Sequence, residues 1–93
     1  QQISKHVTSK MNVTERLIRG KSRRQDVALA RQVIMYLSRE LTNLPLSKIG
    51  NQLGKRDHST VVHACKTIEN KINDDDLFKN QIDDYLVVLS KQQ

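Results

Sequence analysis

Apolar residues recur along the chain at helical spacing, and this periodicity predicts six helices. Ile3, Val7 and Met11 are four residues apart, which places them on one face of an amphipathic first helix. A short second helix is predicted to start at Thr14, whose hydroxyl can cap it, and to end at Gly20. The third helix is the longest, and its buried stripe is predicted at Val27, Ala30, Ile34, Leu37 and Leu41.

The residues around the third helix predict where it begins and ends. Asp26 near its start places a carboxylate at the positive end of the helix dipole. Pro45 cannot continue the helix, so the sequence predicts an end near Thr42 and Asn43. Ahead of this helix, Lys21–Arg24 is predicted to form a basic loop.

Two further helices are predicted on either side of a glycine turn. Ser47 is expected to cap the fourth helix, which ends before Gly54 because glycine readily adopts the positive φ of a helix C-terminus. Asp57 is expected to cap the fifth helix through the amide groups of its first turn. The apolar face of the fifth helix is Val61, Ala64, Cys65, Ile68 and Ile72, and its polar face is Ser59, His63, Lys66 and Asn70.

A last helix is predicted after the break at Asn73–Asp76, with the apolar set Leu77, Phe78, Ile82, Leu86 and Leu89. Aromatic residues make up only 3% of the chain, and it holds three glycines and one proline, which favours helices over a sheet. The sequence therefore predicts an all-α fold, a compact bundle of about six helices. The 93 residues form one domain, 1–93.

The distribution of charge favours a polyanionic partner. The net charge is +6, and residues 1–42 hold nine Lys or Arg against three acidic residues. Residues 73–93 reverse this balance, with two Lys or Arg against five acidic residues. A basic body with an acidic tail suits nucleic acid, although a solvated basic surface has the same composition.

Several other classes of protein are excluded by composition. No apolar run is long enough to span a membrane, and the first ten residues contain no apolar signal-peptide core. The absence of an initiator Met indicates a chain cut from a longer protein. Cys65 is the only cysteine, so no internal disulfide is possible and a reducing cytosol is expected.

The glycine turn and its two helices, about residues 46–72, have the layout of a helix-turn-helix whose second helix enters the major groove of DNA. The residues placed to meet base edges are His58, Ser59 and Thr60, with His63 and Lys66 further along the helix. Two helices joined by a glycine turn also occur in proteins that never touch DNA. The pattern alone leaves open a protein-interaction domain that docks through the acidic tail or the first helix.

The basic loop Lys21–Arg24 is a second candidate DNA contact, because a short Arg segment can enter a narrow minor groove. Simple attraction to phosphates is the alternative. On the third helix, Gln32 and Arg39 are seven residues apart and share a face, so both could reach one phosphate strand. Arg31 is a further polar residue of this helix, and a solvated helix face is the alternative for all three.

The sequence gives little support for a metal site, a nucleotide-binding site or a catalytic site. His58 and His63 are separated by about 140° around a helix, and Cys65 lies on the far side from His63, so the three cannot form a tetrahedral metal site. The segment Gly20–Ser22 resembles the end of a phosphate-binding loop, but position 15 is Glu where Gly is required and no strand precedes it. No oxyanion element accompanies any Cys-His or Asp-His pair.

The segment Gly54–Lys66, GKRDHSTVVHACK, carries the most specific signal, because it matches each fixed position of the pattern G-x-R-D-H-[TS]-T-V-x-H-A. Together with Leu41–Asn43, Ile49–Gly50 and Ala30–Gln32, it resembles the C-terminal DNA-binding domain, domain IV, of the DnaA family of bacterial chromosomal replication initiators. The resemblance covers roughly residues 3–90. It implies a Trp-repressor-like helical bundle that binds short boxes of double-stranded DNA in the replication origin.

The resemblance also implies which residues contact DNA. Contacts to bases are implied in the major groove at the helix-turn-helix and in the minor groove at the basic loop; the base-reading residues are Arg23, Leu46, Ser47, Asp57, His58 and Ser59. The implied phosphate-binding residues are Lys21, Arg24, Arg31, Gln32, Arg39, Arg56, Thr60, His63 and Lys66. Ser47 stands where Pro is frequent in the family, and Ser59 replaces a Thr.

Family members carry an ATPase module before this domain, and that module is absent from this chain. The resemblance therefore implies no cofactor and no catalysis in this fragment, with ATP confined to the missing module. The expected partners are double-stranded DNA, the remainder of the initiator and regulatory proteins. The fragment is expected to be monomeric and to lie in the bacterial cytoplasm at the nucleoid; a transcriptional-repressor-like module is the alternative DNA-binding function.

Overall fold

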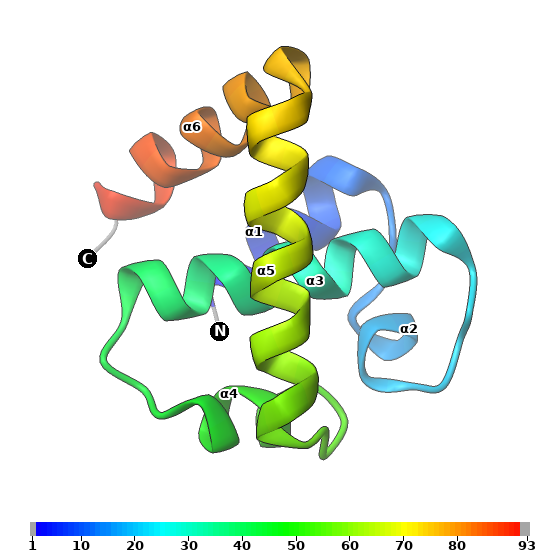
Figure 1. Cartoon of the computed structure of the whole chain (residues 1–93). Coiled ribbons are helices and arrows are strands. Elements are labelled where there is room, and N and C mark those ends of the chain that lie inside the picture. The colour runs from blue at the N-terminus through cyan, green and yellow to red at the C-terminus, as the bar shows by residue number, and fades with distance from the viewer. Residues whose placement is uncertain (1, 92–93) are drawn as a thin grey trace.

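Residues 2–91 are described by the computed structural model, and the regular elements among them are all α-helices (Figure 1). The six helices are α1 (Gln2–Met11), α2 (Glu15–Arg19), α3 (Gln25–Leu41), α4 (Leu46–Gln52), α5 (His58–Asp74) and α6 (Asp76–Ser90). The predicted all-α fold of about six helices is confirmed.

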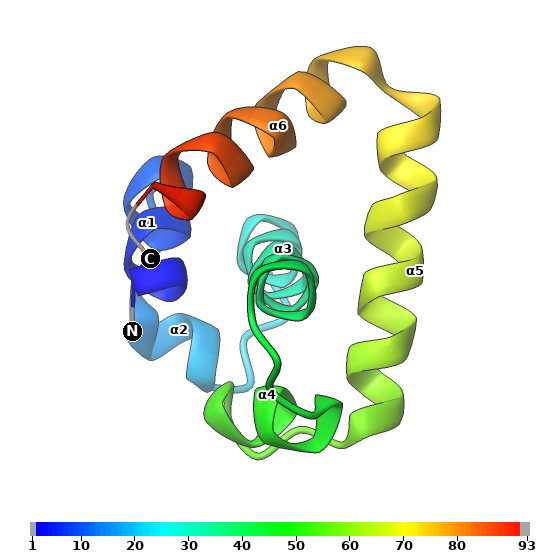
Figure 2. The ribbon, with the colours of Figure 1, turned by 90° about the vertical axis from the view of Figure 1, so that its left-hand side faces the viewer.

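Helix α3 lies at the centre of the molecule. Figure 2 looks along its axis. In this view α5 lies to the right of α3, α1 and α2 lie to its left, α6 lies above it and α4 lies below it. Because neighbours surround it, α3 buries Val33 and Met35 in addition to four members of the predicted stripe, Val27, Ala30, Ile34 and Leu37, while the fifth, Leu41, is partly buried. A helix covered on most sides does not need a polar face, which explains why the apolar surface of α3 is wider than one stripe.

The local signals at the helix ends are mostly confirmed. The hydroxyl of Thr14 accepts a hydrogen bond from the amide of Leu17 at 3.2 Å, which caps α2. Helix α3 ends at Leu41, with Thr42 as its C-cap residue. The carboxylate of Asp26 accepts the amide of Val27 at 2.9 Å in the first turn of α3.

Two details of the predicted helices are wrong. Ser47 does not cap α4, because this helix begins at Leu46, two residues earlier than a Ser47 cap requires, and has Pro45 as its N-cap residue, without a side-chain cap. Leu77 is not part of the buried face of α6, since 82% of it is exposed. It lies about 100° around the helix from Phe78 and so points away from the face that buries Phe78 and Ile82. Tyr85, which was not predicted, is buried on that face.

No helix among residues 2–91 combines the length and the apolar character that crossing a membrane requires.

Candidate nucleic-acid interface

A tight turn joins α4 to α5 and sets their angle. Gly54 has a φ of 92°, as its predicted place after the end of α4 requires, and Lys55 also lies in the left-handed region with a φ of 61°. The amide of Arg56 donates to the carbonyl of Gly50 at 2.8 Å, so the chain folds back onto α4. A Cβ on Gly50 would overlap the carbonyl oxygen of Arg56. Position 54 therefore favours glycine because its φ is positive, and position 50 requires glycine because there is no space for a Cβ.

Asp57 caps α5, as predicted. Its carboxylate accepts the amide of Ser59 at 3.3 Å and lies 3.0 Å from Nδ1 of His58. The hydrogen bond from the Ser59 amide is the main reason why the pKa of Asp57 lies below its ordinary value. The cap is therefore a carboxylate at neutral pH, at the solvent-exposed start of α5.

The contribution of this cap to the stability of the fold is expected to depend on pH. A lowered pKa in the folded state means that the ionised cap stabilises the fold above the unfolded pKa, about 3.9, and that this stabilisation disappears as the pH falls through the folded pKa. The melting temperature of the Asp57→Ala variant should lie below the parent's by a constant gap above about pH 5. The gap should close in acid. A gap that is the same at every pH would show that the charge of Asp57 contributes nothing.

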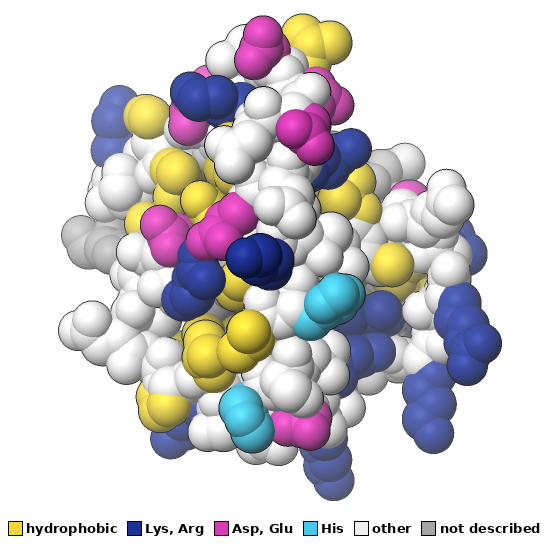
Figure 3. Space-filling view, viewed as in Figure 1, with side chains coloured by type: hydrophobic (Ala, Val, Ile, Leu, Met, Phe, Trp, Pro, Cys, Tyr) yellow, Lys and Arg dark blue, Asp and Glu magenta, His cyan; other side chains and the backbone are white. Residues whose placement is uncertain are grey.

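The face of α5 that points away from the core is polar and exposed, as predicted. Val61, Ala64, Cys65 and Ile68 are buried on the inner side, whereas His58, Ser59, Thr60, His63 and Lys66 are exposed. Figure 3 shows histidine side chains along this helix, with Lys and Arg side chains gathered below and to its right. Val62 also belongs to this face, and half of it is exposed. The sequence pattern indicated no role for Val62.

The basic loop runs between α2 and α3, as predicted. Lys21, Arg23 and Arg24 are exposed there. Arg24 forms an ion pair with Asp26 at 2.7 Å, but both side chains are largely in solvent, so this pair contributes little stability. The loop thus presents its cations next to the start of α3.

A small hollow of about 130 Å³ lies between α3 and the first turns of α5. Five of the predicted phosphate-binding residues, contributed by α3, the turn and α5, line it: Arg31, Gln32, Arg56, Thr60 and His63. Its remaining described lining is Ala28, Met35 and Ala64, so no acidic residue contributes to it. The structure brings together cations and hydrogen-bond donors that are up to 32 positions apart in the sequence.

Arg31 is buried, with only 9% of it exposed. Its Nε donates to the carbonyl of Ile18 at 2.8 Å, and its Nη2 donates to the carbonyls of Leu17 at 3.1 Å and Gly20 at 3.3 Å. Burial lowers the pKa of Arg31, and the charge of Arg56 lowers it further. The solvated helix face that the sequence left open for Arg31 is wrong. One signal was available, because position 31 is four after Val27 and three before Ile34, on the apolar stripe itself.

Arg56 donates to two of the same carbonyls. Its Nη2 donates to Gly20 at 2.7 Å, and its Nη1 donates to Ile18 at 3.4 Å and to the carbonyl of Leu53. Burial lowers the pKa of Arg56. These contacts span up to 38 residues of sequence, so no local pattern pointed to them.

Arg39 lies apart from the hollow, although Gln32 on the same helix lines it. Its guanidinium donates to Glu69 on α5 at 2.6 Å and to Glu40 at 3.2 Å, and it lies 5.5 Å from the ring centre of Tyr36. The hydrogen bond to Glu69 is the main cause that raises the pKa of Arg39. A DNA phosphate at Arg39 would have to compete with these two carboxylates.

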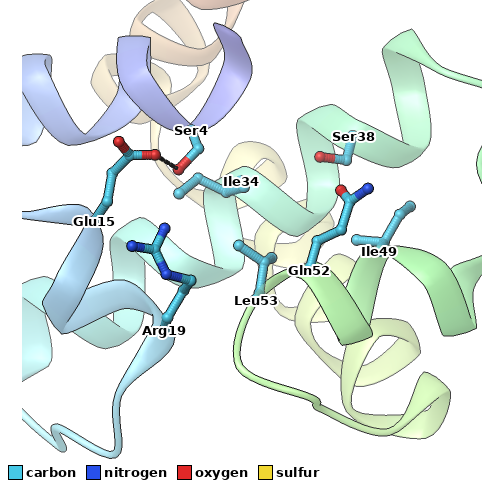
Figure 4. Close-up of a pocket in the computed structure, with 8 residues that line it drawn as sticks. All are labelled: Ser4, Glu15, Arg19, Ile34, Ser38, Ile49, Gln52 and Leu53. Atoms are coloured by element: carbon cyan, nitrogen blue, oxygen red, sulfur yellow. Dashed lines mark hydrogen bonds between the residues drawn. The ribbon is translucent and has the colours of Figure 1, made fainter. Parts of the chain in front are cut away.

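A larger hollow of about 290 Å³ lies among α1, α2, α3 and α4 (Figure 4). It has an apolar floor of Ile34, Ile49 and Leu53, and at its rim Ser4 donates to Glu15 at 2.9 Å. None of the residues predicted to contact DNA lines this hollow.

Residues 2–91 hold no group of three or more His, Cys, Asp or Glu side chains that could bind a metal ion. Cys65 is fully buried, as expected of a core residue, and burial raises the pKa of its thiol.

Comparison with known proteins agrees with the resemblance found in the sequence. Residues 1–68 match the family described as the bacterial dnaA protein helix-turn-helix. The chain is 50% identical over 72 residues to the chromosomal replication initiator protein DnaA of Streptococcus thermophilus, which covers 77% of this chain and 16% of the relative. It is 47% identical over 70 residues to that of Chlorobaculum tepidum, which covers 75% of this chain and 14% of the relative.

A third relative, the DnaA protein of Limosilactobacillus reuteri, is 45% identical over 80 residues, which covers 86% of this chain and 18% of the relative. The chain thus spans less than a fifth of the length of these relatives. The family match covers most of the chain and includes the whole turn, the hollow and the first two-thirds of α5. This chain belongs to the bacterial DnaA helix-turn-helix family.

Proposed function

We propose that this domain binds double-stranded DNA at sequence-specific boxes of a replication origin, for the initiation of chromosomal replication. The start of α5 enters the major groove, and Arg23 of the basic loop enters the adjacent minor groove. The hollow between α3 and α5 is the observation that carries this proposal, because it combines two guanidinium groups with polar side chains at the start of an exposed helix.

The hollow suits a phosphate group of the DNA backbone. Arg31 and Arg56 bring two positive charges to its lining, and no described acidic residue there neutralises them. A bound phosphate would relieve the repulsion between these charges and accept hydrogen bonds from Gln32, Thr60 or His63. Its position beside the first turn of α5 would fix the depth at which that helix enters the groove.

The residues around this phosphate-binding hollow then recognise the bases. Asp57, His58 and Ser59 begin α5, and Leu46 and Ser47 begin α4. Val62 is one turn beyond His58 on the same helix face, where its exposed methyl groups suit the C5-methyl group of thymine. Phosphate contacts set the register, and these side chains with Arg23 supply the sequence preference.

Titration of two labelled duplexes across a salt series tests the proposed function. One duplex carries a DnaA-type box and the other has the same bases in scrambled order. We expect tighter binding to the box at every salt concentration, with an affinity that falls steeply as salt increases. Equal binding to both duplexes would reduce the domain to a basic helical module without sequence preference. Binding that does not depend on salt would contradict phosphate contacts altogether.

The His58→Ala variant separates base recognition from general attraction. We expect it to cost about 1–3 kcal/mol of binding free energy on the box and much less on scrambled DNA, as a lost base contact does. His6→Ala is a matched control, since His6 lies on α1 against the ring of Tyr85 and outside the proposed interface. Equal losses on both duplexes would show that His58 does not read a base.

We place the remaining activities of the initiator outside this chain. Because the relatives are more than five times as long as the matched region, ATP binding, oligomer formation and origin melting are assigned to other parts of the whole protein. This domain then acts as a monomeric binding module in the bacterial cytoplasm, without a cofactor, and regulatory proteins are its expected further partners.

A further inference from the structure

Two arginines connect the two DNA-reading elements of this domain. We propose that Arg31 and Arg56 are positioning residues that fix the basic loop relative to the recognition helix, so that Arg23 and α5 meet the two grooves with a preset spacing. This inference deepens the proposed function and rests on it. It gives both arginines a task besides phosphate binding.

The point of attachment is the C-terminal end of α2. A helix leaves its last carbonyl groups without partners inside the helix, and α2 has only five residues. The carbonyls of Ile18 and Gly20 each accept hydrogen bonds from both arginines. Arg31 comes from α3 and Arg56 from the turn before α5, so these two carbonyls connect three elements.

The basic loop starts directly after this attachment point. Gly20 is held by both arginines, and α3 begins at Gln25, so only four residues lie between two fixed ends. Within the loop, the amide of Arg24 donates to the hydroxyl of Ser22 at 3.3 Å. A loop this short has little freedom once its ends are fixed. The position of Gly20 therefore limits where the backbone of Arg23 can lie.

The turn of the helix-turn-helix lies directly against α2. A Cβ on Gly54 would overlap the carbonyl oxygen of Arg19 and would come within 3.1 Å of the Arg19 carbonyl carbon. The turn and the end of α2 are therefore in contact without room for a side chain between them. A displacement of α2 must move Arg56 and the start of α5 as well.

Arginine suits this task better than lysine. The planar guanidinium of Arg56 donates to carbonyls of α2 and of Leu53 at once, whereas an ammonium group presents its donors at one point. Two neighbouring positive charges repel each other, but the carbonyls at the negative end of α2 and a phosphate in the hollow favour both.

Hydrogen exchange of the free protein provides the first test. Arg56→Lys keeps the positive charge but cannot span these carbonyls. We expect several-fold faster amide exchange for residues 20–24 and unchanged exchange for the second half of α5. Arg16→Lys is the matched control, because Arg16 is an exposed arginine of α2. Unchanged exchange at residues 20–24 would overturn the proposal.

Double-mutant cycles on the box duplex provide the second test. In the parent, Arg23→Ala is expected to weaken binding about tenfold or more, and in the Arg56→Lys background by about threefold or less. His58→Ala should cost the same factor in both backgrounds. If Arg56 only contacts a phosphate or only stabilises the fold, its effect multiplies with that of Arg23→Ala, which would overturn the positioning role.

Two provisions keep these tests decisive. If Arg56→Lys does not fold, Arg31→Lys takes its place in both measurements, since it reaches the same two carbonyls. If no duplex is preferred by the parent, the proposed function fails, and so does the positioning of Arg23 for DNA. The exchange measurement still decides independently whether the arginine pair holds the loop.

Discussion

Gly50→Ala is expected to abolish preferential binding to the box and to destabilise the fold by about 3 kcal/mol or more. The added Cβ would overlap the carbonyl oxygen of Arg56, come 3.0 Å from its carbonyl carbon and lie 3.2 Å from a methyl group of Val61. Backbone atoms of a tight turn cannot rotate away as a flexible side chain can. The turn would have to open, which moves the start of α5 and breaks the hydrogen bond from the Arg56 amide to Gly50.

Urea unfolding measures the destabilisation, and titration of the box duplex at a temperature where the variant is folded measures the effect on binding. Gly20→Ala is the matched control. Its added Cβ would lie 3.3 Å from the nearest atom, the carbonyl oxygen of Arg16, and Gly20 has a φ of −86° that any residue adopts. The control should therefore change stability much less. A Gly50→Ala variant with the parent's unfolding midpoint would show that the turn adapts at little cost.

Arg31→Ala is expected to have the second largest effect, a destabilisation of about 2–4 kcal/mol together with weaker binding to both the box and the scrambled duplex. The variant removes the hydrogen bonds that Arg31 donates to the carbonyls of Ile18, Leu17 and Gly20 at the end of α2. It also leaves a space in a buried position. It also removes one of the two cations of the hollow. The slope of log affinity against log salt should therefore decrease by about one.

The two effects of Arg31→Ala are measured separately. Unfolding of the free protein reports on the hydrogen bonds, and the salt slope of the folded variant reports on the phosphate contact. Arg16→Ala removes an exposed cation from α2 and should leave the unfolding midpoint almost unchanged. An unaltered midpoint for Arg31→Ala would mean that water replaces the guanidinium at no cost. An unaltered salt slope would remove Arg31 from the phosphate-binding set.

Much of the fold could be predicted from the sequence, because many of its signals act within a few residues. Thr14 and Asp57 cap helices through amides two or three positions away. Gly54 adopts a positive φ just after the end of α4. The apolar stripe of α5 follows from helical periodicity. The motif around His58 was specific enough to indicate the family, which the comparison with known proteins confirmed.

Two local interpretations failed because a competing rule was stronger. Ser47 had the right chemistry for a cap, but Pro45, with a φ of −63°, is the N-cap residue, so α4 starts two residues earlier than a Ser47 cap requires. Leu77 was counted with the apolar face of α6 because it is hydrophobic. In the structure, only the face of α6 that carries Phe78 packs against the core. Leu77 is one position away, about 100° around the helix, and is therefore exposed to solvent.

The sequence by itself determined the six helices, the helix-turn-helix and the polar face of α5, because these depend on neighbours within about one helical turn. Only the tertiary structure decided that Arg31 and Arg56 share the carbonyls of Ile18 and Gly20, and that Gly50 touches the backbone of Arg56. These contacts depend on how helices distant in the sequence pack around α3. Periodicity shows which face of a helix is buried, but it does not show which backbone atoms that face will meet.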